Sequence, residues 1–172
     1  MVRALHECGV KNVVMMTGDN HRTAEAIARE VGVDSFYAEV LLEDKAAFVR
    51  KAKAEGHTVI MTGDGVNDSP ALSEADAGIA VSSGAAIARE IADITVSSQD
   101  LWTMVTLRRL SQALMDRIHR NYRFIVGFNC SLIALGVLGV LPPTMSALLH
   151  NTSTLAISLK SMTDLLPPPE EG

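Results

Sequence analysis

The spacing of hydrophobic residues up to position 99 predicts short strands alternating with short helices. Apolar runs at 13–16 and 58–61 are typical of buried strands, and each ends at a polar loop. Helical spacing of apolar residues marks 21–31 and 44–54. Shorter segments complete the pattern, as strands at 37–40, 78–81 and 94–96 and helices at 69–75 and 85–92. Strands separated by helices form parallel βαβ units, so we expect an α/β fold with a doubly wound parallel sheet.

The pattern changes near Asp100, whose carboxylate can cap a long helix by accepting bonds from free backbone N–H groups. Basic side chains then gather before position 124, at Arg108, Arg109, Arg117, His119, Arg120 and Arg123. From Phe124 to Leu159 the chain has no Asp, Glu, Lys or Arg. A run of about 20 apolar residues crosses a bilayer core. We therefore expect two transmembrane helices, at about 124–141 and 144–162, separated by two prolines.

These patterns predict four regions along the chain. They are an α/β part at 1–99, a basic linking helix at 100–123, a membrane hairpin within 124–166 and a disordered tail at 167–172. Basic residues flank both ends of the hairpin, which favours two cytoplasmic ends. The prediction is an integral, multi-pass protein of the plasma or inner membrane, with residues 1–123 in the cytoplasm. The alternative is a hydrophobic helical hairpin buried in a soluble protein.

Composition narrows the classes of function. The net charge of −5 argues against a general nucleic-acid binder. Cys8 and Cys130 lie far apart, whereas a disulfide framework needs closer and more numerous cysteines, so we expect both to be reduced. The N-terminal residues alternate charged and apolar side chains and lack the uninterrupted apolar core of a signal peptide.

Two loops share the sequence Met-Thr-Gly-Asp, at 16–19 and 61–64, and each follows a predicted strand. Ligands bind at the carboxyl ends of strands in open parallel sheets, so both loops should face one cleft. The Thr17 hydroxyl and the Gly18 backbone N–H can donate to a phosphate oxygen, and glycine allows close approach. A single Thr-Gly-Asp can equally be an ordinary turn, and Asp19 can simply cap the following helix.

Oxygen ligands in and after the second loop favour Mg²⁺. Asp64 and Asp68 lie four residues apart with Asn67 between them. Mg²⁺ is usually held by one or two carboxylates together with phosphate oxygens. Lys45 opens a predicted helix, where its ammonium group can neutralise a transferring phosphoryl group, although a solvated lysine is the alternative. Together these residues predict a site for Mg²⁺ and phosphate.

The segment Gly-Asp-Gly-Val-Asn-Asp-Ser-Pro-Ala-Leu at 63–72 resembles the hinge motif of P-type ATPases, Gly-Asp-Gly-x-Asn-Asp-Ala-Pro-Ala-Leu. Ser69 is the one departure from that motif. Residues 17–20 resemble the family's second phosphate-site motif, and residues 43–45 resemble the segment that supplies its lysine. Residues 75–80 resemble the continuation of the hinge motif. The resemblance implies that 1–99 is the C-terminal half of a phosphorylation domain with a haloacid-dehalogenase-like sheet.

The resemblance also implies a role for each candidate residue. Asp64 would ligate Mg²⁺, with Asn67 and Asp68 completing the polar shell. The remaining candidates would hold and stabilise the phosphoryl group, with Asp19 shaping its loop: Thr17, Gly18, Asp19 and Lys45. In this family ATP is the substrate of the whole pump. Its γ-phosphate is transferred to an aspartate and then hydrolysed while the membrane part exchanges its cation.

The family's phosphorylated aspartate lies in an Asp-Lys-Thr-Gly-Thr motif, which this chain lacks. Asp44 and Lys45 are followed by two alanines and cannot replace it. We therefore expect a truncated product, a fragmentary gene sequence or one piece of a split pump, inactive alone and needing the missing N-terminal part as its partner. The alternatives are a haloacid-dehalogenase-type phosphatase, although no nucleophilic Asp-x-Asp or Asp-x-Thr precedes Met15, and a non-catalytic membrane remnant.

Two membrane helices after the phosphorylation domain resemble the heavy-metal-transporting branch of the family. Asn129 and Cys130 are polar groups in the first helix, and His150 and Thr154 share one face of the second. Imidazole and thiolate suit Zn²⁺, Cu⁺, Co²⁺ or Fe²⁺, so these four residues are candidate ligands of a transported cation. They can instead pack helices together. Residues 150–154 resemble the His-Glu-Gly-Gly-Thr of cobalt- and iron-type members without its glutamate, which leaves the metal open.

Overall fold

The computed structural model describes residues 1–64, 67–81, 91–96 and 100–166. It divides into two compact units, Met1–Thr106 and Leu107–Gly172. The predicted helix at 85–92 falls largely outside the described residues, and so does the predicted tail at 167–172.

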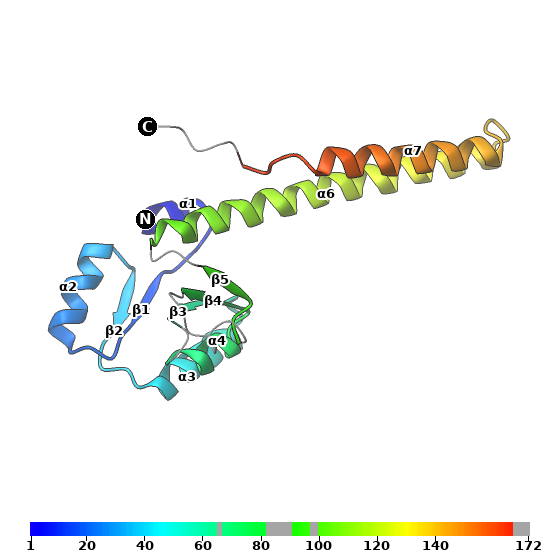
Figure 1. The fold of residues 1–172 in the computed structure, drawn as a ribbon. Coiled ribbons are helices and arrows are strands. Elements are labelled where there is room, and N and C mark those ends of the chain that lie inside the picture. Colours follow the sequence, from blue (N-terminus) through cyan, green and yellow to red (C-terminus); the bar gives the residue numbers. More distant parts are fainter. Residues whose placement is uncertain (65–66, 82–90, 97–99, 167–172) are drawn as a thin grey trace, which may run out of the picture. The chain divides into compact units, whose positions relative to one another are not determined.

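The first unit is an α/β arrangement of short elements (Figure 1). In chain order these are α1 (Val2–Glu7), β1 (Val14–Met16), α2 (His21–Val31), β2 (Ser35–Tyr37), α3 (Leu42–Ala54), β3 (Ile60–Gly63), α4 (Ser69–Glu74), β4 (Ala77–Val81) and β5 (Ile94–Val96). All strand pairs are parallel, as the alternating pattern predicts. Among the described residues they form two sheets, β1–β2 and β3–β4–β5, where the sequence predicted one.

The same backbone arrangement precedes the first strand of each sheet. The Asp34 carboxylate accepts the Val13 N–H at 2.6 Å, and the Asp34 N–H donates to the Val13 carbonyl. The Asp76 carboxylate accepts the Val59 N–H at 2.8 Å, and the Asp76 N–H donates to the Val59 carbonyl. Hydrogen bonds to a charged acceptor are roughly twice as strong as neutral ones. Asp34 therefore joins the start of β2 to the residue before β1, and Asp76 joins the start of β4 to the residue before β3.

A compact core holds α3 and α4 against β3. Its buried members are Ala46, Val49, Met61, Ala71 and Leu72, and Met16 of β1 packs against them. Burying a side chain such as Leu72 contributes roughly 1.5–3 kcal/mol. Gly78 permits the close approach of β4 to α4, because a Cβ there would lie 2.7 Å from the Leu72 carbonyl oxygen. The packing fixes the ends of β3 and α4, where the candidate Asp residues lie.

Several element bounds differ from the predicted ones. Helix α2 begins and ends as predicted, and Gly32 ends it in the left-handed conformation. The strand expected at 37–40 lies instead at Ser35–Tyr37, because the next residues return to contact the loop after β1. Helix α1 was not predicted. Val2 and Cys8, at its two ends, are buried, so α1 is held by packing rather than by a strong local pattern.

The helical region consists of α6 (Trp102–Val137) and α7 (Pro143–Ser161). The Asp100 carboxylate accepts the Trp102 N–H at 2.9 Å, which confirms the predicted cap. Helix α6 runs without a break through the boundary expected at 123–124. It ends before the predicted 141, and Gly139 turns the chain with a φ of 73°. No helix in the described part of the chain combines the length and the apolar character that crossing a membrane requires.

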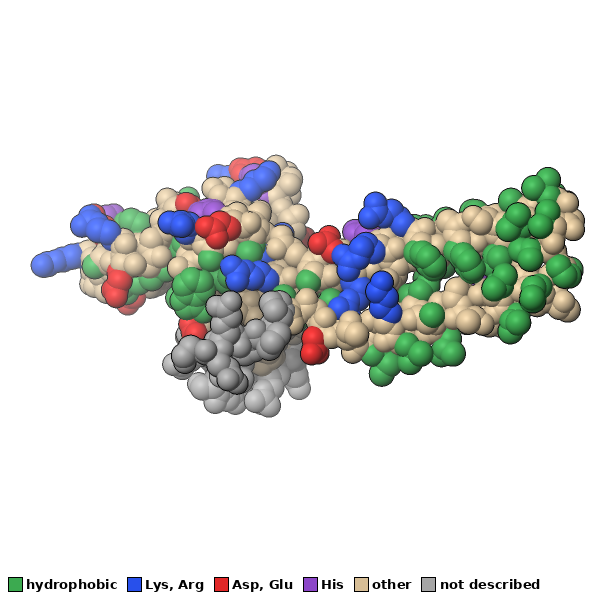
Figure 2. Space-filling view, turned by 90° about the horizontal axis from the view of Figure 1, so that it is seen from above, with side chains coloured by type: hydrophobic (Ala, Val, Ile, Leu, Met, Phe, Trp, Pro, Cys, Tyr) green, Lys and Arg blue, Asp and Glu red, His purple; other side chains and the backbone are tan. Residues whose placement is uncertain are grey.

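Hydrophobic side chains of α6 and α7 remain largely exposed. Among described residues of the second unit, Leu132 alone is buried. Exposed side chains include Phe124, Ile133, Val137, Leu148, Leu155 and Leu159. Figure 2 shows hydrophobic side chains over the part of this helix pair nearest the loop between α6 and α7. Lys and Arg side chains gather toward the opposite end of the pair. Exposed apolar surface of this extent is typical of an interaction surface.

Candidate magnesium and phosphate site

Two predicted site residues meet in the first unit. The Lys45 Nζ lies 2.7 Å from Asp68 Oδ1, and both side chains are 12% exposed. Lys45 lies in the first turn of α3, and Asp68 immediately precedes α4, so the packing of these two helices brings the pair together. Two charges so far from water stabilise each other only as a pair, and removing one typically costs about 3–5 kcal/mol.

The Asp68 side chain occupies the space beside Gly63 that a Cβ would take. A Cβ on Gly63 would lie 2.5 Å from Asp68 Oδ2, so any larger residue there would force the Asp68 side chain to move. Gly63 is the last residue of β3, and Asp64 follows it with an exposed side chain. Asn67 is also exposed, and residues 65–66 lie outside the described residues. Asp68 is thereby positioned at the carboxyl end of β3, where a parallel sheet binds ligands.

The loop after β1 is closed by its own hydrogen bonds. The Thr17 hydroxyl donates to Asp19 Oδ2 at 2.8 Å, and the Asp19 N–H donates to the Thr17 hydroxyl at 3.1 Å. The carbonyls of Asp19 and Thr17 accept the N–H groups of Glu39 and Val40. Gly18 faces nearly open space, since the nearest atom to an added Cβ would be the Val40 oxygen at 3.9 Å. This arrangement fits the role of Asp19 in shaping the loop around an accessible Gly18.

Asp19 does not cap α2. The Asn20 side chain accepts the Thr23 N–H at 3.0 Å and is the cap instead. The alternative interpretation of Asp19 as a helix cap is therefore wrong. Asn is as good a cap residue as Asp, so the sequence contained the signal one residue further on.

The residues present fit a Mg²⁺ ion that is bound partly by carboxylates and partly by phosphate oxygens and waters. Within the described residues no three His, Cys, Asp or Glu side chains lie close enough to hold a metal by themselves. Mg²⁺ commonly takes only one or two carboxylates and completes its shell with phosphate oxygens and waters. Asp64 and Asp68 are the two carboxylates that would hold such an ion. Lys45 already partly neutralises the second of them.

The candidates for the transported cation are brought together only in part. His150 Nδ1 of α7 lies 2.8 Å from Asn129 Oδ1 of α6, so this pair joins the two helices. The Thr154 hydroxyl donates to the His150 carbonyl at 3.0 Å, within its own helix. Cys130 is a free, exposed thiol, and it follows Asn129 directly, so it projects in a different direction around α6.

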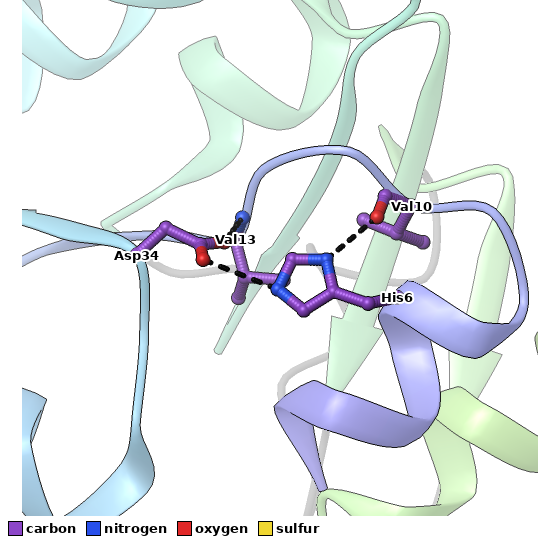
Figure 3. A network of polar contacts seen from close by, with 4 residues as sticks. All are labelled: His6, Val10, Val13 and Asp34. Carbon is purple, nitrogen blue, oxygen red and sulfur yellow. Dashed lines mark hydrogen bonds and ion pairs between the residues drawn. The ribbon is translucent and has the colours of Figure 1, made fainter.

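A histidine that the sequence did not single out links α1 to the strands. Figure 3 shows the His6 ring between the Val10 carbonyl, 2.7 Å from Nδ1, and the Asp34 carboxylate, 3.1 Å from Nε2. The Val10 hydrogen bond, joined by the Asp34 charge, raises the pKa of His6 above 6.5 against a smaller effect of burial. The Val59 N–H, together with Lys53, lowers the pKa of Asp76 below 3.8. Both groups support the strand connections rather than the candidate site.

Known proteins resemble both parts of this chain. A family model for haloacid dehalogenase-like hydrolases matches residues 1–76. A zinc-exporting P-type ATPase of Mycobacterium marinum is 40% identical over 91% of this chain and 22% of its own length. A copper-exporting P-type ATPase of Staphylococcus saprophyticus is 40% identical over 91% of this chain and 20% of its own length. The chain therefore spans about a fifth of the length of these curated relatives.

A solved structure extends the similarity to the three-dimensional level. The crystal structure of a zinc-transporting PIB-type ATPase in its E2.Pi state matches with a TM-score of 0.85 and 33% identity. The match covers 94% of this chain and 26% of the solved chain, so it reaches beyond the α/β unit into the helices.

Proposed function

Because this chain is a relative of the heavy-metal P-type ATPases over nine-tenths of its length, we propose that it is the C-terminal portion of an ATP-driven heavy-metal cation pump. It supplies the Mg²⁺- and phosphate-binding loops and part of the membrane path of the metal. The observation that carries the proposal is the match to a zinc-transporting ATPase over 94% of the chain at a TM-score of 0.85. A match of this extent favours a pump over a free-standing phosphatase, because a phosphatase of that type would not account for α6 and α7.

Bound Mg²⁺ would supply positive charge that neutralises the oxygens of the transferring phosphoryl group. Asp64 and Asp68 are the residues that would hold it, with Asn67 completing the polar shell. The Lys45 ammonium group orients the Asp68 carboxylate through their 2.7 Å contact, and it would stabilise an aspartyl phosphate. Thr17 and Gly18 would hold the phosphoryl group, and the Thr17 hydroxyl would then turn its proton from Asp19 Oδ2, which accepts it at 2.8 Å here, to a phosphate oxygen.

The remaining part of the pump is the partner that this chain requires. Met16 of β1 packs against the same core as Met61 of β3, yet no strand ladder joins the two strands among the described residues. Ile60, at the start of β3, is 51% exposed although it is a large hydrophobic residue in a parallel strand. A strand supplied by the rest of the pump, with the phosphorylated aspartate, would pair with these edges and cover them.

We place α6 and α7 in the bilayer, among the other membrane helices of the whole pump. Their exposed hydrophobic side chains support this location, and so does the absence of formal charge from Phe124 to Leu159. Lipid and neighbouring helices would cover these faces. Asn129 and His150, 2.8 Å apart across the two helices, are the strongest candidates on the metal path, with Cys130 and Thr154 as further candidates.

A chimeric pump tests the proposal. The segment of the zinc-exporting relative that matches this chain is replaced by this chain, and metal-stimulated ATP hydrolysis and aspartyl-phosphate formation are measured. We expect both activities, and we expect Asp64→Asn to abolish phosphorylation from ATP while Glu30→Gln, an exposed change on α2, leaves it intact. A folded chimera that forms no phosphoenzyme would refute the proposal.

The same chimera tests the metal path. ATP hydrolysis is compared across Zn²⁺, Cu⁺, Co²⁺, Fe²⁺ and Mn²⁺ in the parent chimera and in His150→Ala and Asn129→Ala. We expect both variants to lose metal stimulation in parallel because the two side chains bond to each other. Unchanged affinity and selectivity in His150→Ala would exclude His150 as a ligand.

A further inference from the structure

A cavity of about 630 Å³ lies between α6 and α7, at the basic end of the helix pair. Its lining combines four cations with apolar surface: Arg117, Arg120, Arg123, Lys160, Phe124 and Ile157. No Asp or Glu is among the described residues that line it. The cavity therefore carries a concentrated positive charge without an acidic side chain to balance it.

One of the four cations, Arg117, is already hydrogen-bonded to the backbone. The Arg117 guanidinium donates to the carbonyls of Ser161, Thr163 and Asp164, at 2.6–2.9 Å. These carbonyls lie at and beyond the C-terminal end of α7, where helix carbonyls lack intrahelical partners. Asn121 adds a bond to the Ser161 hydroxyl at 2.9 Å. Arg117 and Asn121 thus attach the end of α7 to α6 beside the cavity.

The other three cations are available to a ligand. Arg120 and Arg123 are three residues apart on α6 and so face the same side of the helix, and Lys160 faces them from the last turn of α7. All three side chains are exposed. Guanidinium groups bind phosphate oxygens through two parallel hydrogen bonds, and a lysine adds a point charge. The arrangement suits one phosphate group with its charge spread over several oxygens.

Apolar surface continues directly from this cationic cavity. Phe124 follows Arg123, is 54% exposed and stacks on Phe128 with ring centroids 5.7 Å apart. On α7, Leu155 and Leu159 are also exposed. A ligand that fits both parts has an anionic head and long apolar chains. Basic pockets between membrane helices at the cytoplasmic side bind lipid headgroups in this way.

We propose that this cavity binds the phosphate headgroup of an anionic phospholipid, whose acyl chains lie along the apolar faces of α6 and α7. The inference rests on the proposed location of the helices in a bilayer. Arg120, Arg123 and Lys160 hold the phosphate, while Arg117 and Asn121 keep α7 in position. Such a lipid would hold α6 and α7 together where the basic segment of the helix pair meets its uncharged segment.

The test uses the full chain reconstituted in phosphatidylcholine vesicles that contain either spin-labelled phosphatidylglycerol or spin-labelled phosphatidylcholine. Electron paramagnetic resonance gives the motionally restricted fraction of each lipid and hence their relative association constant. We expect a preference for phosphatidylglycerol. Each basic residue near an anionic lipid contributes roughly a fivefold factor, so the triple variant R120Q/R123Q/K160Q should lower this preference by roughly tenfold or more.

The matched control K11Q/R22Q/R109Q removes the same number of positive charges outside the cavity and should keep the preference. Circular dichroism verifies that both triple variants remain helical. Excess inorganic phosphate should not release the restricted phosphatidylglycerol, whereas full release would assign the cavity to soluble phosphate and overturn the lipid proposal. Equal restriction of both lipids by the unmodified chain would overturn it too, while the bilayer location would stand. A chain that enters neither kind of vesicle would refute the bilayer location and the lipid proposal together.

Discussion

Polar residues are paired in both units, but their surroundings differ. In the α/β unit, Lys45 and Asp68 are each 12% exposed and lie beside a packed core of side chains such as Leu72 and Val49. In the helical unit, Asn129 and His150 join two helices whose apolar side chains remain exposed, with Leu132 alone buried among its described residues. The first unit buries its own ion pair, whereas the polar pair of the second unit lies between helices whose apolar side chains are exposed.

The physical reason lies in how each pair is kept from water. A pair inside a packed unit is desolvated by the protein itself, so its geometry follows from the fold. The strength of a hydrogen bond on an exposed helix surface depends on whether water, lipid or another helix surrounds it. The energetics of the Lys45–Asp68 pair can therefore be tested in the chain alone, whereas phosphoryl transfer and the metal path both need the rest of the proposed pump.

The largest expected effect comes from breaking the buried ion pair. Lys45→Ala leaves the Asp68 charge without its partner, and we expect about 3–5 kcal/mol of destabilisation. The exposed Arg29–Glu25 pair is the matched control, and Arg29→Ala should cost about 1 kcal/mol or less. Hydrogen exchange of the 60–63 segment measures the opening free energy of the α/β unit. Equal effects of the two substitutions would show that burial of the pair has no energetic weight.

A second comparison concerns hydrophobic packing. Leu72→Ala, at a side chain with 1% exposure, should destabilise the α/β unit by about 2–5 kcal/mol because a cavity remains. Leu148→Ala, at a side chain with 59% exposure, should change the stability of the detergent-solubilised chain by about 0.5 kcal/mol or less. Hydrogen exchange resolved to each unit separates the two results. A large effect at Leu148 would mean that α7 packs far more tightly than its exposure indicates.

A third comparison is between Gly63, which is in close contact with Asp68, and Gly127, which has open space around it. In Gly63→Ala the new Cβ would lie 2.5 Å from Asp68 Oδ2, so the carboxylate must move, and we expect a cost of about 1–3 kcal/mol. Gly127 in α6 has open space around it, so Gly127→Ala should be neutral or stabilising by up to about 1 kcal/mol. The same exchange measurement applies. A neutral Gly63→Ala would contradict the close contact with Asp68.

The smallest effect is a dependence on pH within the α/β unit. The pKa of His6 is raised in the folded state, so its contribution is complete below 6.5 and is lost as the pH rises through the folded-state pKa. The pKa of Asp76 is lowered, so its contribution is present above 3.8 and is lost as the pH falls through the folded-state pKa. The difference in unfolding midpoint between the unmodified chain and His6→Ala should therefore shrink as the pH rises. A difference independent of pH would mean that the His6 charge has no role.

Sequence patterns predicted the elements that are fixed by short-range signals. Helix α2 has the predicted bounds because Asn20, an apolar periodicity and Gly32 lie within one short segment. The cap at Asp100 is likewise local, between residues two apart. The strand β2 and the helix α1 were misplaced or missed, because the first is shifted by bonds to the loop after β1 and the second is held by buried Val2 and Cys8.

The sequence by itself determined which residues are candidates for the chemistry, since the loop after β3 and the loop after β1 are recognisable from residue types at fixed spacing. Only the tertiary structure decided which of them meet. Lys45 reaches Asp68 across 23 positions, and His150 reaches Asn129 across 21. Such contacts depend on how helices and strands pack, which no local periodicity specifies. The tertiary structure also showed that Asp34 and Asp76, to which the sequence assigned no structural role, accept the backbone N–H groups of Val13 and Val59, just before β1 and β3.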